Sequence, residues 1–291
     1  MKILLTGASG FTGLHFAKLA QGAGHEIVAC RVDLTDLSAV QNAVMDAQPD
    51  AVVHLAGISF VGHADDTAFY AVNVVGTTNL LNALVKLTHK PRCVLLASSA
   101  NVYGNCINSP IVENQLPSPL NHYASSKLVM EHMALTFRDR LSIVITRPFN
   151  YTGVGQHINF VIPKLVDHFA RRADSVSLGN LQVEREFNDV QMVCNAYLAL
   201  LQYGQPGEIY NVCSGKPYAL VDVLEVLSRI SGHTLKVEVN PAFVRLNELH
   251  RLCGSPDRLW ALMAQHGVEL PVPTVEDTLQ SMLLAAGADH S

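Results

Sequence analysis

Short apolar runs that alternate with helical patterns through the first half of the chain constrain its fold more than any other feature of the sequence. The runs read "KILLT", "EIVAC", "AVVHLA", "CVLLAS" and "SIVIT". Helical patterns separate them, at residues 11–22, 36–46, 66–88 and 121–138. Because adjacent parallel strands need a crossover connection, which is usually a helix, this rhythm predicts βαβ units around a buried parallel sheet. The predicted fold class is therefore α/β, with a Rossmann-type doubly wound sheet.

The rhythm breaks after Arg147, where Pro and Gly residues punctuate an irregular stretch. Further helical patterns follow at residues 161–172, 190–203, 219–231 and 274–285. The runs "EIYNV" and "LKVEV" predict two more strands. No low-complexity linker interrupts the chain, so we expect two closely packed units. Residues 1–152 and 188–215 would form the Rossmann domain, and residues 153–187 and 216–291 a smaller α/β substrate-binding domain.

Composition narrows the function classes. Hydrophobic residues make up 49% of the 291 positions and charged residues 15%, which is typical of a well-packed globular protein. A net charge of -5 without basic runs favours neither nucleic acid nor an anionic membrane as a partner. Six cysteines without a CxxC pair predict reduced thiols in a cytoplasmic protein. The 13 histidines lack metal-ligand spacing, so we expect no metal site.

The segment "KILLTGASGFTG" places Gly7, Gly10 and Gly13 between a predicted strand and a predicted helix. Residues without side chains let the backbone approach a pyrophosphate, and the helix N-terminus presents free N–H groups to the anion. An ordinary strand-to-helix turn is the alternative interpretation. The βαβ pattern that follows favours dinucleotide binding over that alternative.

The end of the second predicted strand, "EIVACRVDLTD", bears on the cofactor. Arg31 stands where NAD-preferring Rossmann enzymes usually have an acidic residue for the ribose hydroxyls. Its planar guanidinium can pair with a 2′-phosphate, so we expect NADP(H) to be preferred, with NAD(H) as the alternative. A solvated loop position for Arg31 is the competing interpretation. Asp33 would either cap the next helix or accept a hydrogen bond from the adenine amino group.

Three side chains form a candidate catalytic set. Tyr123 and Lys127 are spaced i, i+4 in "NHYASSKLVMEH", so a helix would present both on one face. A nearby ammonium favours the phenolate and prepares the phenol for proton exchange. Ser99 follows a buried run, at the carboxyl edge of the sheet where α/β proteins bind ligands. Each feature alone is common on surfaces or in helix caps, but their order along the chain favours catalysis.

Together these motifs resemble the extended short-chain dehydrogenases of the NAD-dependent epimerase/dehydratase family, over nearly the whole length. The matching segments are "TGASGFTG", "DLTD", "VVHLAG", "NVVGTTNLL", "SSANVYG", "YASSK", "RPFNYTGVGQ", "EREFNDV" and "YNVCSG". The resemblance implies that Ser99, Tyr123 and Lys127 are catalytic and that Tyr123 and Lys127 also contact the cofactor. Besides Gly7, Gly10, Gly13 and Arg31, the implied cofactor-binding residues are Phe11, Thr12, Asp33, Leu34, Leu55, Ala56, Gly57, Asn73, Pro148 and Phe149.

The resemblance also implies a nucleotide-diphosphate sugar as substrate. The implied substrate-binding residues are Ser99, Asn101, Asn150, Phe160, Val161, Asn180, Arg185 and Arg245. The two arginines suit a diphosphate because a guanidinium donates to two phosphate oxygens at once. A surface ion pair with Glu184 or Glu186 is the alternative for Arg185, and the match around Arg245 is only approximate.

The positions after Ser99 bear on the reaction. Dehydratases of this family carry an acidic residue there, whereas this chain has Ala100 and Asn101. The short link from "EIVAC" to "DLTD" resembles the sugar-nucleotide 4-ketoreductases. The stretch "GNLQVEREFNDVQMVCNAYLALLQYGQPGEIYNVCSG" most resembles those that reduce GDP-4-keto-6-deoxy-D-mannose, which implies formation of GDP-D-rhamnose with NADPH. Val154 and Glu186 depart from the usual pattern, which leaves the sugar and base open. The alternatives are a UDP-hexose 4-epimerase with tightly held NAD and a non-enzymatic NADP-sensing regulator, although such a regulator would typically have lost Tyr123 or Lys127.

A homodimer is the expected assembly, because enzymes of this type pair the helices matching 66–88 and 121–138 into a four-helix bundle. Leu80, Leu84, Val129 and Met133 are candidate interface residues on those helices. The alternative is that these apolar side chains face the sheet of their own subunit.

Overall fold

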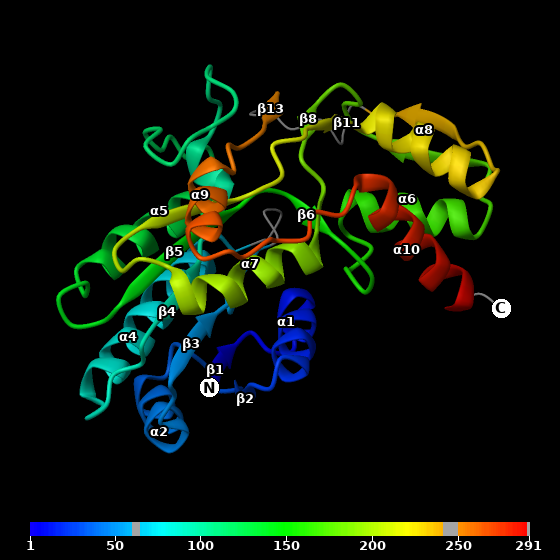
Figure 1. Ribbon diagram of the computed structural model, residues 1–291. Coiled ribbons are helices and arrows are strands. Elements are labelled where there is room, and N and C mark those ends of the chain that lie inside the picture. The colour runs from blue at the N-terminus through cyan, green and yellow to red at the C-terminus, as the bar shows by residue number, and fades with distance from the viewer. Residues whose placement is uncertain (60–64, 241–249, 290–291) are drawn as a thin grey trace.

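The computed structural model describes residues 1–59, 65–240 and 250–289, and its centre is a six-stranded parallel sheet (Figure 1). The strand order is β10-β5-β4-β3-β1-β2, and every neighbouring pair is parallel. The strands are β1 (Lys2–Thr6), β2 (Glu26–Cys30), β3 (Ala51–His54), β4 (Val94–Ala97), β5 (Ile143–Pro148) and β10 (Ile209–Val212). This arrangement confirms the predicted Rossmann-type α/β fold.

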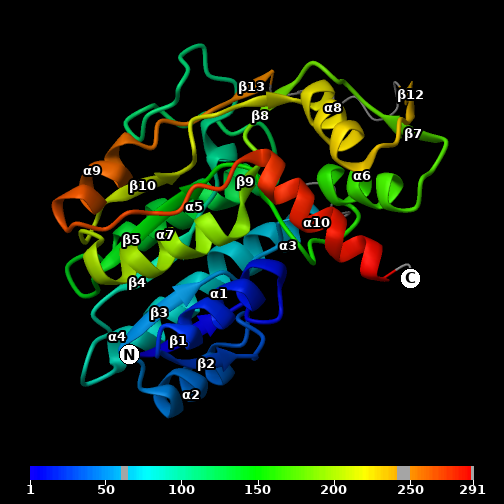
Figure 2. The ribbon, with the colours of Figure 1, turned by 45° about the vertical axis from the view of Figure 1, so that its right-hand side comes forward.

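Helices cover both faces of the sheet, as the doubly wound pattern requires (Figures 1 and 2). One face carries α1 (Phe11–Gly22), α7 (Val190–Tyr203) and α9 (Asp257–Gln265), and the other carries α2 (Leu37–Ala47), α4 (Thr77–Lys86) and α5 (His122–Leu135). Within β1, Ile3 and Leu5 pack against the face covered by α1, α7 and α9, and Leu4 packs against the face covered by α2, α4 and α5. This alternation is the period-two pattern of a strand buried on both sides.

The helix expected over residues 66–88 changes type along its length. It consists of α3 (Asp66–Tyr70), a π-helical segment η1 (Ala71–Gly76) and α4. π-Helical segments are rare and occur mostly at functional sites. Here the segment contains Asn73, which is fully buried. Among the described residues, this stretch is the one helix long and apolar enough to cross a membrane, judged by length and composition only, and it packs against α2 and α5.

The apolar face of α4 points into the protein. Leu80 and Leu84 are fully buried in the core that α2, α4 and α5 share, so the prediction that they serve a dimer interface is wrong. Their side chains face the sheet, as the alternative interpretation held. Val129 on α5 is 45% exposed and Met133 is half-buried. The homodimer itself stays a prediction.

A second core lies at one end of the molecule, away from the N-terminus (Figure 2). It is built from α6 (Val161–Ala170), β7 (Ser175–Leu178), α8 (Leu220–Ser231), β12 (Lys236–Val239) and α10 (Val275–Asp289). Short strands lie between the two cores: β6 (Tyr151–Thr152), β8 (Glu184–Arg185), β9 (Asn188–Asp189), β11 (Tyr218–Ala219) and β13 (Arg251–Leu252). The boundaries of the two predicted domains stay a prediction. Helix α9, inside the second predicted segment, packs on α7 and β10 of the first core.

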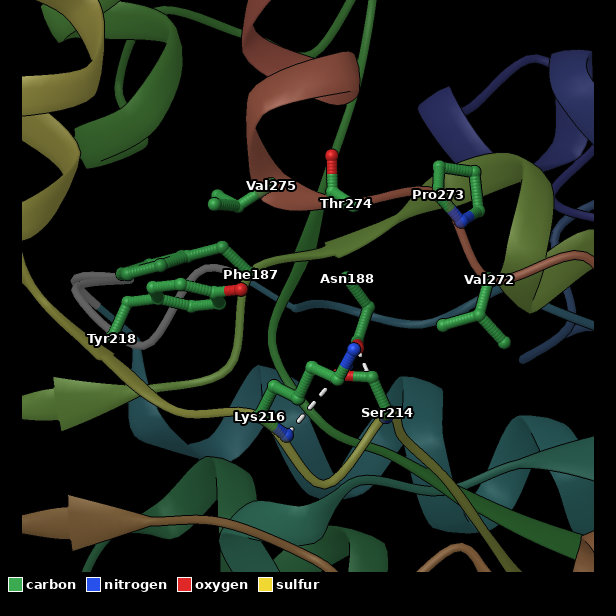
Figure 3. Close-up of a pocket in the computed structure, with 9 residues that line it drawn as sticks. All are labelled: Phe187, Asn188, Ser214, Lys216, Tyr218, Val272, Pro273, Thr274 and Val275. Carbon is green, nitrogen blue, oxygen red and sulfur yellow. Dashed lines mark hydrogen bonds between the residues drawn. The ribbon is translucent and has the colours of Figure 1, made fainter.

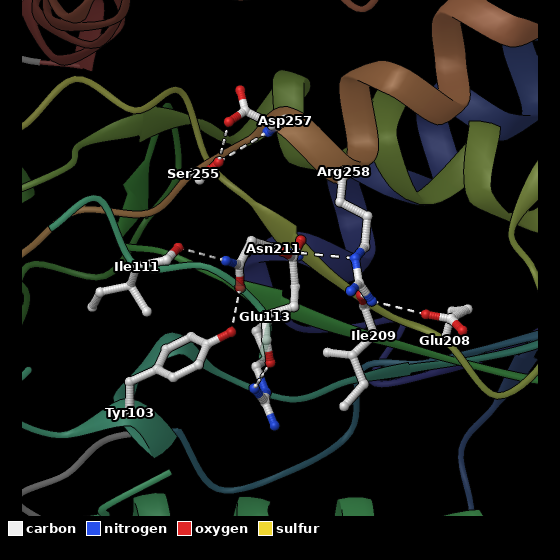
Figure 4. Close-up of polar contacts among 10 residues, drawn as sticks. Tyr103, Ile111, Glu113, Glu208, Ile209, Asn211, Ser255, Asp257 and Arg258 are labelled. Carbon is white, nitrogen blue, oxygen red and sulfur yellow. Dashed lines mark hydrogen bonds and ion pairs between the residues drawn. The ribbon is translucent and has the colours of Figure 1, made fainter. Parts of the chain in front are cut away.

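The loop that follows the 3₁₀ helix η2 (Ala100–Tyr103) is fastened to the edge strand β10 (Figure 4). The Asn211 side chain accepts from the Tyr103 hydroxyl at 2.7 Å and donates to the Ile111 carbonyl at 2.9 Å. The Asn211 N–H donates to Glu113 Oε1 at 2.9 Å, and Arg258 Nε lies 3.8 Å from the other Glu113 oxygen. These bonds satisfy buried polar groups that an edge strand would otherwise leave unpaired.

Candidate active site

Ser99, Tyr123 and Lys127 meet at the carboxyl edge of the sheet, as the sequence predicted. Ser99 follows β4 and begins η2, where its Oγ accepts from the N–H of Asn101 at 3.2 Å. Tyr123 lies in the first turn of α5, which Asn121 caps by accepting from the Ala124 N–H at 2.9 Å. The Ser99 hydroxyl is close enough to the Tyr123 phenol to lower its pKa. The side chains of a phenol and an alcohol therefore converge on one position, where both can contact a single substrate oxygen.

Burial controls the charge states of Tyr123 and Lys127. Burial raises the pKa of the Tyr123 phenol, and the neighbouring Ser99 hydroxyl acts in the opposite direction. Burial lowers the pKa of Lys127 to about 8, although the nearby Glu131 carboxylate raises it. Lys127 Nζ donates to the carbonyl of Ala97, the last residue of β4, at 2.8 Å. At neutral pH the phenol is protonated and can act as an acid toward a substrate oxygen.

Asn73 ties the π-helical segment to the catalytic helix. Its Oδ1 accepts from the Ile58 N–H at 3.0 Å, and its Nδ2 donates to Ser126 Oγ at 2.9 Å. Ser126 in turn donates to the Tyr123 carbonyl at 2.8 Å. Sequence reasoning missed Ser126, although its position between Tyr123 and Lys127 on the inner face of a helix is the pattern that could have indicated it.

His54 at the end of β3 is a second residue that sequence reasoning missed. Its Nδ1 lies 2.7 Å from Thr6 Oγ1 and its Nε2 lies 2.8 Å from Thr77 Oγ1. Thr77 Oγ1 already donates to the Asn73 carbonyl at 2.7 Å, so His54 must donate from Nε2 and accept at Nδ1. Burial lowers the pKa of His54 to about 3, and the Lys127 charge contributes a smaller effect in the same direction. A neutral imidazole thus connects the end of β1 with the segment that bears Asn73.

The glycine-rich loop after β1 forms a cradle that only glycine can build. A Cβ on Gly13 would lie 2.1 Å from the Gly7 carbonyl oxygen. Gly7 has φ +69°, and a Cβ there would lie 2.7 Å from the Ala56 nitrogen. Helix α1 begins at Gly10 without a side-chain cap, so its first N–H groups remain available to an anion. These features fit the pyrophosphate of a dinucleotide, and the contact with Ala56 places the loop after β3 beside it.

A further cradle lies at Gly57, beside the catalytic set. A Cβ at this position would lie 2.7 Å from Asn73 Oδ1 and 3.3 Å from Lys127 Nζ. Leu55, Ala56 and Gly57 therefore follow β3 directly between the glycine loop and the catalytic lysine. This placement is consistent with their predicted position along a bound cofactor.

The segment after β2 contains the exposed Arg31 and the residues that begin α2. Arg31 is exposed and makes no hydrogen bond or ion pair with any described residue. The Asp33 carboxylate accepts from the N–H and hydroxyl of Thr35, both at 2.8 Å, and these bonds lower its pKa. Asp36 accepts from the Ala39 N–H at 3.0 Å and is the cap of α2. Of the two roles considered for Asp33, helix capping thus belongs to Asp36. Leu34 is buried beside Gly76.

Tyr151, in β6, is a third residue that the sequence did not single out. Its hydroxyl hydrogen-bonds Thr12 Oγ1 at 2.8 Å, and its ring stacks on Phe11 at 6.2 Å between centroids. Burial raises the pKa of Tyr151 to about 12, so it remains a neutral hydrogen-bond partner. Tyr151 therefore joins the start of α1 to the segment after β5.

The predicted substrate-binding residues lie on the segments between the two cores. Asn150 is exposed, and its carbonyl accepts from the Asn188 N–H at 3.0 Å. Phe160 precedes α6 and Val161 begins it. Asn180 Oδ1 accepts from the Gln182 N–H at 3.0 Å. Arg245 lies outside the described residues.

The acidic neighbours of Arg185 are engaged with other groups. Arg185 Nη1 donates to the Glu184 carbonyl at 2.8 Å. The Glu184 carboxylate pairs with Arg251. Glu186 is fully buried and accepts from the backbone N–H groups of Ser214, Gly215 and Gly254 at 2.7, 3.1 and 2.7 Å. A buried carboxylate thus joins the turn between β10 and β11 to the segment after β13.

Pro148 is the last residue of β5 and Phe149 follows it, beside the end of the neighbouring strand β4. Phe149 is 1% exposed and packs against Tyr103, and a Cβ on Gly254 would lie 2.5 Å from its ring. Its ring therefore belongs to a small core behind the site. The contribution of these two residues to a nicotinamide site stays a prediction.

A small pocket lies where β9, the turn before β11 and the start of α10 meet (Figure 3). Figure 3 shows the rings of Phe187 and Tyr218 side by side at one end, and Lys216, Ser214 and Asn188 along the floor. Its volume of about 10 Å³ has room for roughly one water molecule. It is therefore too small for a nucleotide. In the described part of the chain, no group of three His, Cys, Asp or Glu side chains is placed to hold a metal ion.

A doubly wound parallel sheet, a glycine cradle at the start of α1 and a Ser-Tyr-Lys set at the carboxyl edge define a class of protein: the NAD(P)-dependent oxidoreductases of the extended short-chain dehydrogenase type. The sequence profile of the NAD dependent epimerase/dehydratase family matches residues 3–213. The chain belongs to this family, as its motifs predicted.

Two relatives and one solved structure are similar over most of the chain. GDP-6-deoxy-D-talose 4-dehydrogenase from Aggregatibacter actinomycetemcomitans is 36% identical, with 89% of this chain and 90% of the relative covered. GDP-6-deoxy-D-mannose reductase from Pseudomonas aeruginosa is 37% identical, with 89% of each covered. The structure of RMD from Pseudomonas aeruginosa complexed with NADPH superposes with a TM-score of 0.89 at 32% identity, covering 99% of this chain and 98% of the other.

Proposed function

We propose that this protein uses NADPH to reduce the 4-keto group of GDP-4-keto-6-deoxy-D-mannose, giving GDP-D-rhamnose. The observation that carries the proposal is the buried Tyr123 phenol beside the Ser99 hydroxyl at the carboxyl edge of the sheet, with Lys127 one turn away on the same helix. Both relatives of 36% and 37% identity are named for GDP-linked 6-deoxyhexoses, which supports the choice of sugar and base.

The described side chains are suited to ketone reduction. When bound, the reduced nicotinamide supplies the hydride. Tyr123 donates its proton to the carbonyl oxygen of the substrate as negative charge develops there. Ser99 donates a second hydrogen bond to the same oxygen and polarises the carbonyl. The Lys127 ammonium stabilises the phenolate that Tyr123 becomes, and the low dielectric of the buried site strengthens that interaction.

Arg31 supports NADPH over NADH as the preferred cofactor. It lies at the end of β2, exposed and without an ion-pair partner among the residues that the structure describes. A guanidinium can pair bidentately with the 2′-phosphate that distinguishes NADPH from NADH. NADH then binds with lower affinity, because the same contact has no phosphate to meet.

A 4-epimerase that retains NAD is the second candidate, because family epimerases use the same Ser-Tyr-Lys set. Its net reaction consumes no reduced cofactor, which separates it from a reductase.

Talose and mannose differ at C4, so reduction from the opposite face would yield GDP-6-deoxy-D-talose instead of GDP-D-rhamnose. We further propose that the enzyme is a cytoplasmic homodimer. Its two subunits would contact each other through the exposed faces of α5 and of the helix over residues 66–88.

The test is to generate GDP-4-keto-6-deoxy-D-mannose in situ, add the protein with NADPH, and follow absorbance loss alongside chromatography of the product. We expect one NADPH to be consumed per GDP-D-rhamnose formed. Accumulation of GDP-6-deoxy-D-talose would correct the stereochemistry and keep the reaction class. Interconversion of UDP-hexoses without added cofactor would overturn the reductase proposal.

A further inference from the structure

Three consecutive residues at the end of β4 each contact a different residue of α5. The Ala97 carbonyl accepts from Lys127 and the Ser98 hydroxyl donates to Glu131, while the Ser99 hydroxyl lies beside the Tyr123 phenol and lowers its pKa. The three helix residues are spaced by four, so they lie on one face of α5, the face turned toward the end of β4. Two of the pairs include catalytic side chains. The pair of Ser98 with Glu131 fixes the same alignment of α5 on β4, and neither residue of this pair belongs to the proposed catalytic set.

Arg147 on β5 holds the Glu131 carboxylate from the other side. Arg147 Nε lies 3.0 Å from Glu131 Oε1, and Nη2 lies 2.6 Å from Oε2. Both residues are buried, with 3% and 1% of their surface exposed. The guanidinium also stacks on the Tyr103 ring at 4.7 Å and donates to the Glu113 carbonyl at 3.4 Å. A bidentate, buried pair of this kind leaves Glu131 a single side-chain orientation.

Glu131 is also the acidic group that acts on Lys127. The ionisable side chains with an electrostatic interaction with Lys127 are Glu131 on α5 and His54 on β3, and Tyr123 lies one turn away on the same face of α5. His54 is neutral because burial lowers its pKa to about 3, and Tyr123 is neutral because burial raises its pKa. Burial also lowers the pKa of Lys127 to about 8, and Glu131 opposes that effect. Glu131 thus supplies the favourable charge for a buried ammonium one turn away.

We propose that Glu131 is a positioning residue, which holds α5 in register on β4 through Ser98 and Arg147 and keeps Lys127 in its ammonium form. The proposal rests on the proposed function only in naming the catalytic set that Glu131 positions. An unpaired ion buried at this depth is costly, whereas a fully paired one defines a unique arrangement of helix and strand. The ion pair therefore stabilises one alignment of Tyr123 with Ser99.

The test measures the protonation of Lys127 directly, without substrate. Protein labelled with ¹³C at the lysine Cε positions is titrated by NMR, and Lys127 is assigned by comparison with Lys127→Arg. The chain has eight lysines, and Lys127 alone is buried among them, so its titration stands apart from the others. We expect the Lys127 midpoint to move to lower pH in Glu131→Gln, and to stay near the wild-type value in Glu131→Asp, which keeps the charge.

The double variant Glu131→Gln with Arg147→Met reduces folding losses, because it removes both members of the buried Arg147–Glu131 pair and leaves no unpaired guanidinium. We expect the same downward movement of the midpoint in this variant. An unchanged midpoint in either Gln-containing variant would overturn the electrostatic role of Glu131.

The register role is measured by turnover. Asp is one methylene shorter than Glu, so Glu131→Asp cannot reach both Ser98 and Arg147. We expect its kcat to fall roughly 10- to 100-fold while the KM for NADPH changes little, since misalignment by about 1 Å has effects of that size. Wild-type kcat in Glu131→Asp would refute the register role. If the wild-type protein does not turn over the GDP sugar but the Lys127 midpoint still shifts in Glu131→Gln, the proposed function is refuted and the role of Glu131 is supported.

Discussion

Replacing Gly13 by alanine tests whether cofactor binding depends on the glycine cradle. The added Cβ would lie 2.1 Å from the Gly7 carbonyl oxygen and 2.8 Å from Ala8 Cα. The first contact is about 1 Å closer than such atoms approach in proteins, and both neighbours are backbone that cannot rotate away. The Gly7 carbonyl also accepts from the Gly10 N–H at 3.0 Å, so the loop must move as a unit. We expect a loss of about 1–3 kcal/mol of unfolding free energy from overpacking.

The moved loop would also carry its N–H groups away from the pyrophosphate. We expect NADPH to bind roughly 10- to 100-fold more weakly, which corresponds to about 1.4–2.8 kcal/mol. Gly22→Ala is the matched control, because it makes the same change in the same helix and no atom lies within 4 Å of the new Cβ. This control should retain wild-type NADPH affinity and gain up to about 1 kcal/mol of stability. Fluorescence titration and urea unfolding measure both quantities, and wild-type NADPH affinity in Gly13→Ala would refute the cradle.

Four further predictions follow from the site and the assembly. Tyr123→Phe should keep cofactor affinity but lower turnover by roughly 100-fold or more in steady-state assays, since it removes the general acid; unchanged turnover would place the proton donor elsewhere. Arg31→Asp should weaken NADPH binding far more than NADH binding in fluorescence titrations, and equal losses would exclude a contact with the 2′-phosphate. The kcat of ketone reduction should fall as pH rises through about 8, where Lys127 loses its proton, while the raised pKa keeps Tyr123 protonated; a flat profile to pH 10 would contradict this. Light scattering should show a dimer at micromolar concentration, and Val129→Arg should give the 31.6 kDa monomer, whereas a monomeric wild type would refute the assembly.

The sequence predicted where Ser99, Tyr123 and Lys127 lie because a parallel sheet brings the ends of its strands together. Ser99 after β4 and the glycine loop after β1 lie at the same edge once the strands are parallel. The spacing of Tyr123 and Lys127 then places both on one helix face. These conclusions depend on local periodicity and strand direction, which the sequence contains.

Contacts between distant residues were not accessible in the same way. The Tyr151 hydroxyl meets Thr12 across 139 positions, and Thr6 meets His54 across 48. No local pattern encodes such pairs, because they depend on how strands and loops pack. Leu80 was assigned to the wrong surface for a related reason: helical periodicity shows that a face is apolar but not whether a sheet or a second subunit covers it.

The most direct test of a reductase is to follow the transferred hydrogen. The protein is incubated with GDP-4-keto-6-deoxy-D-mannose and NADPH that carries deuterium at C4 of the nicotinamide, with each of the two labelled faces used separately. The product is then examined by NMR and mass spectrometry. We predict that one of the two cofactors yields GDP-D-rhamnose with a single deuterium at C4 of the sugar, in an amount equal to the NADPH oxidised. A product without deuterium from both cofactors, or sugar conversion without NADPH oxidation, would contradict the account.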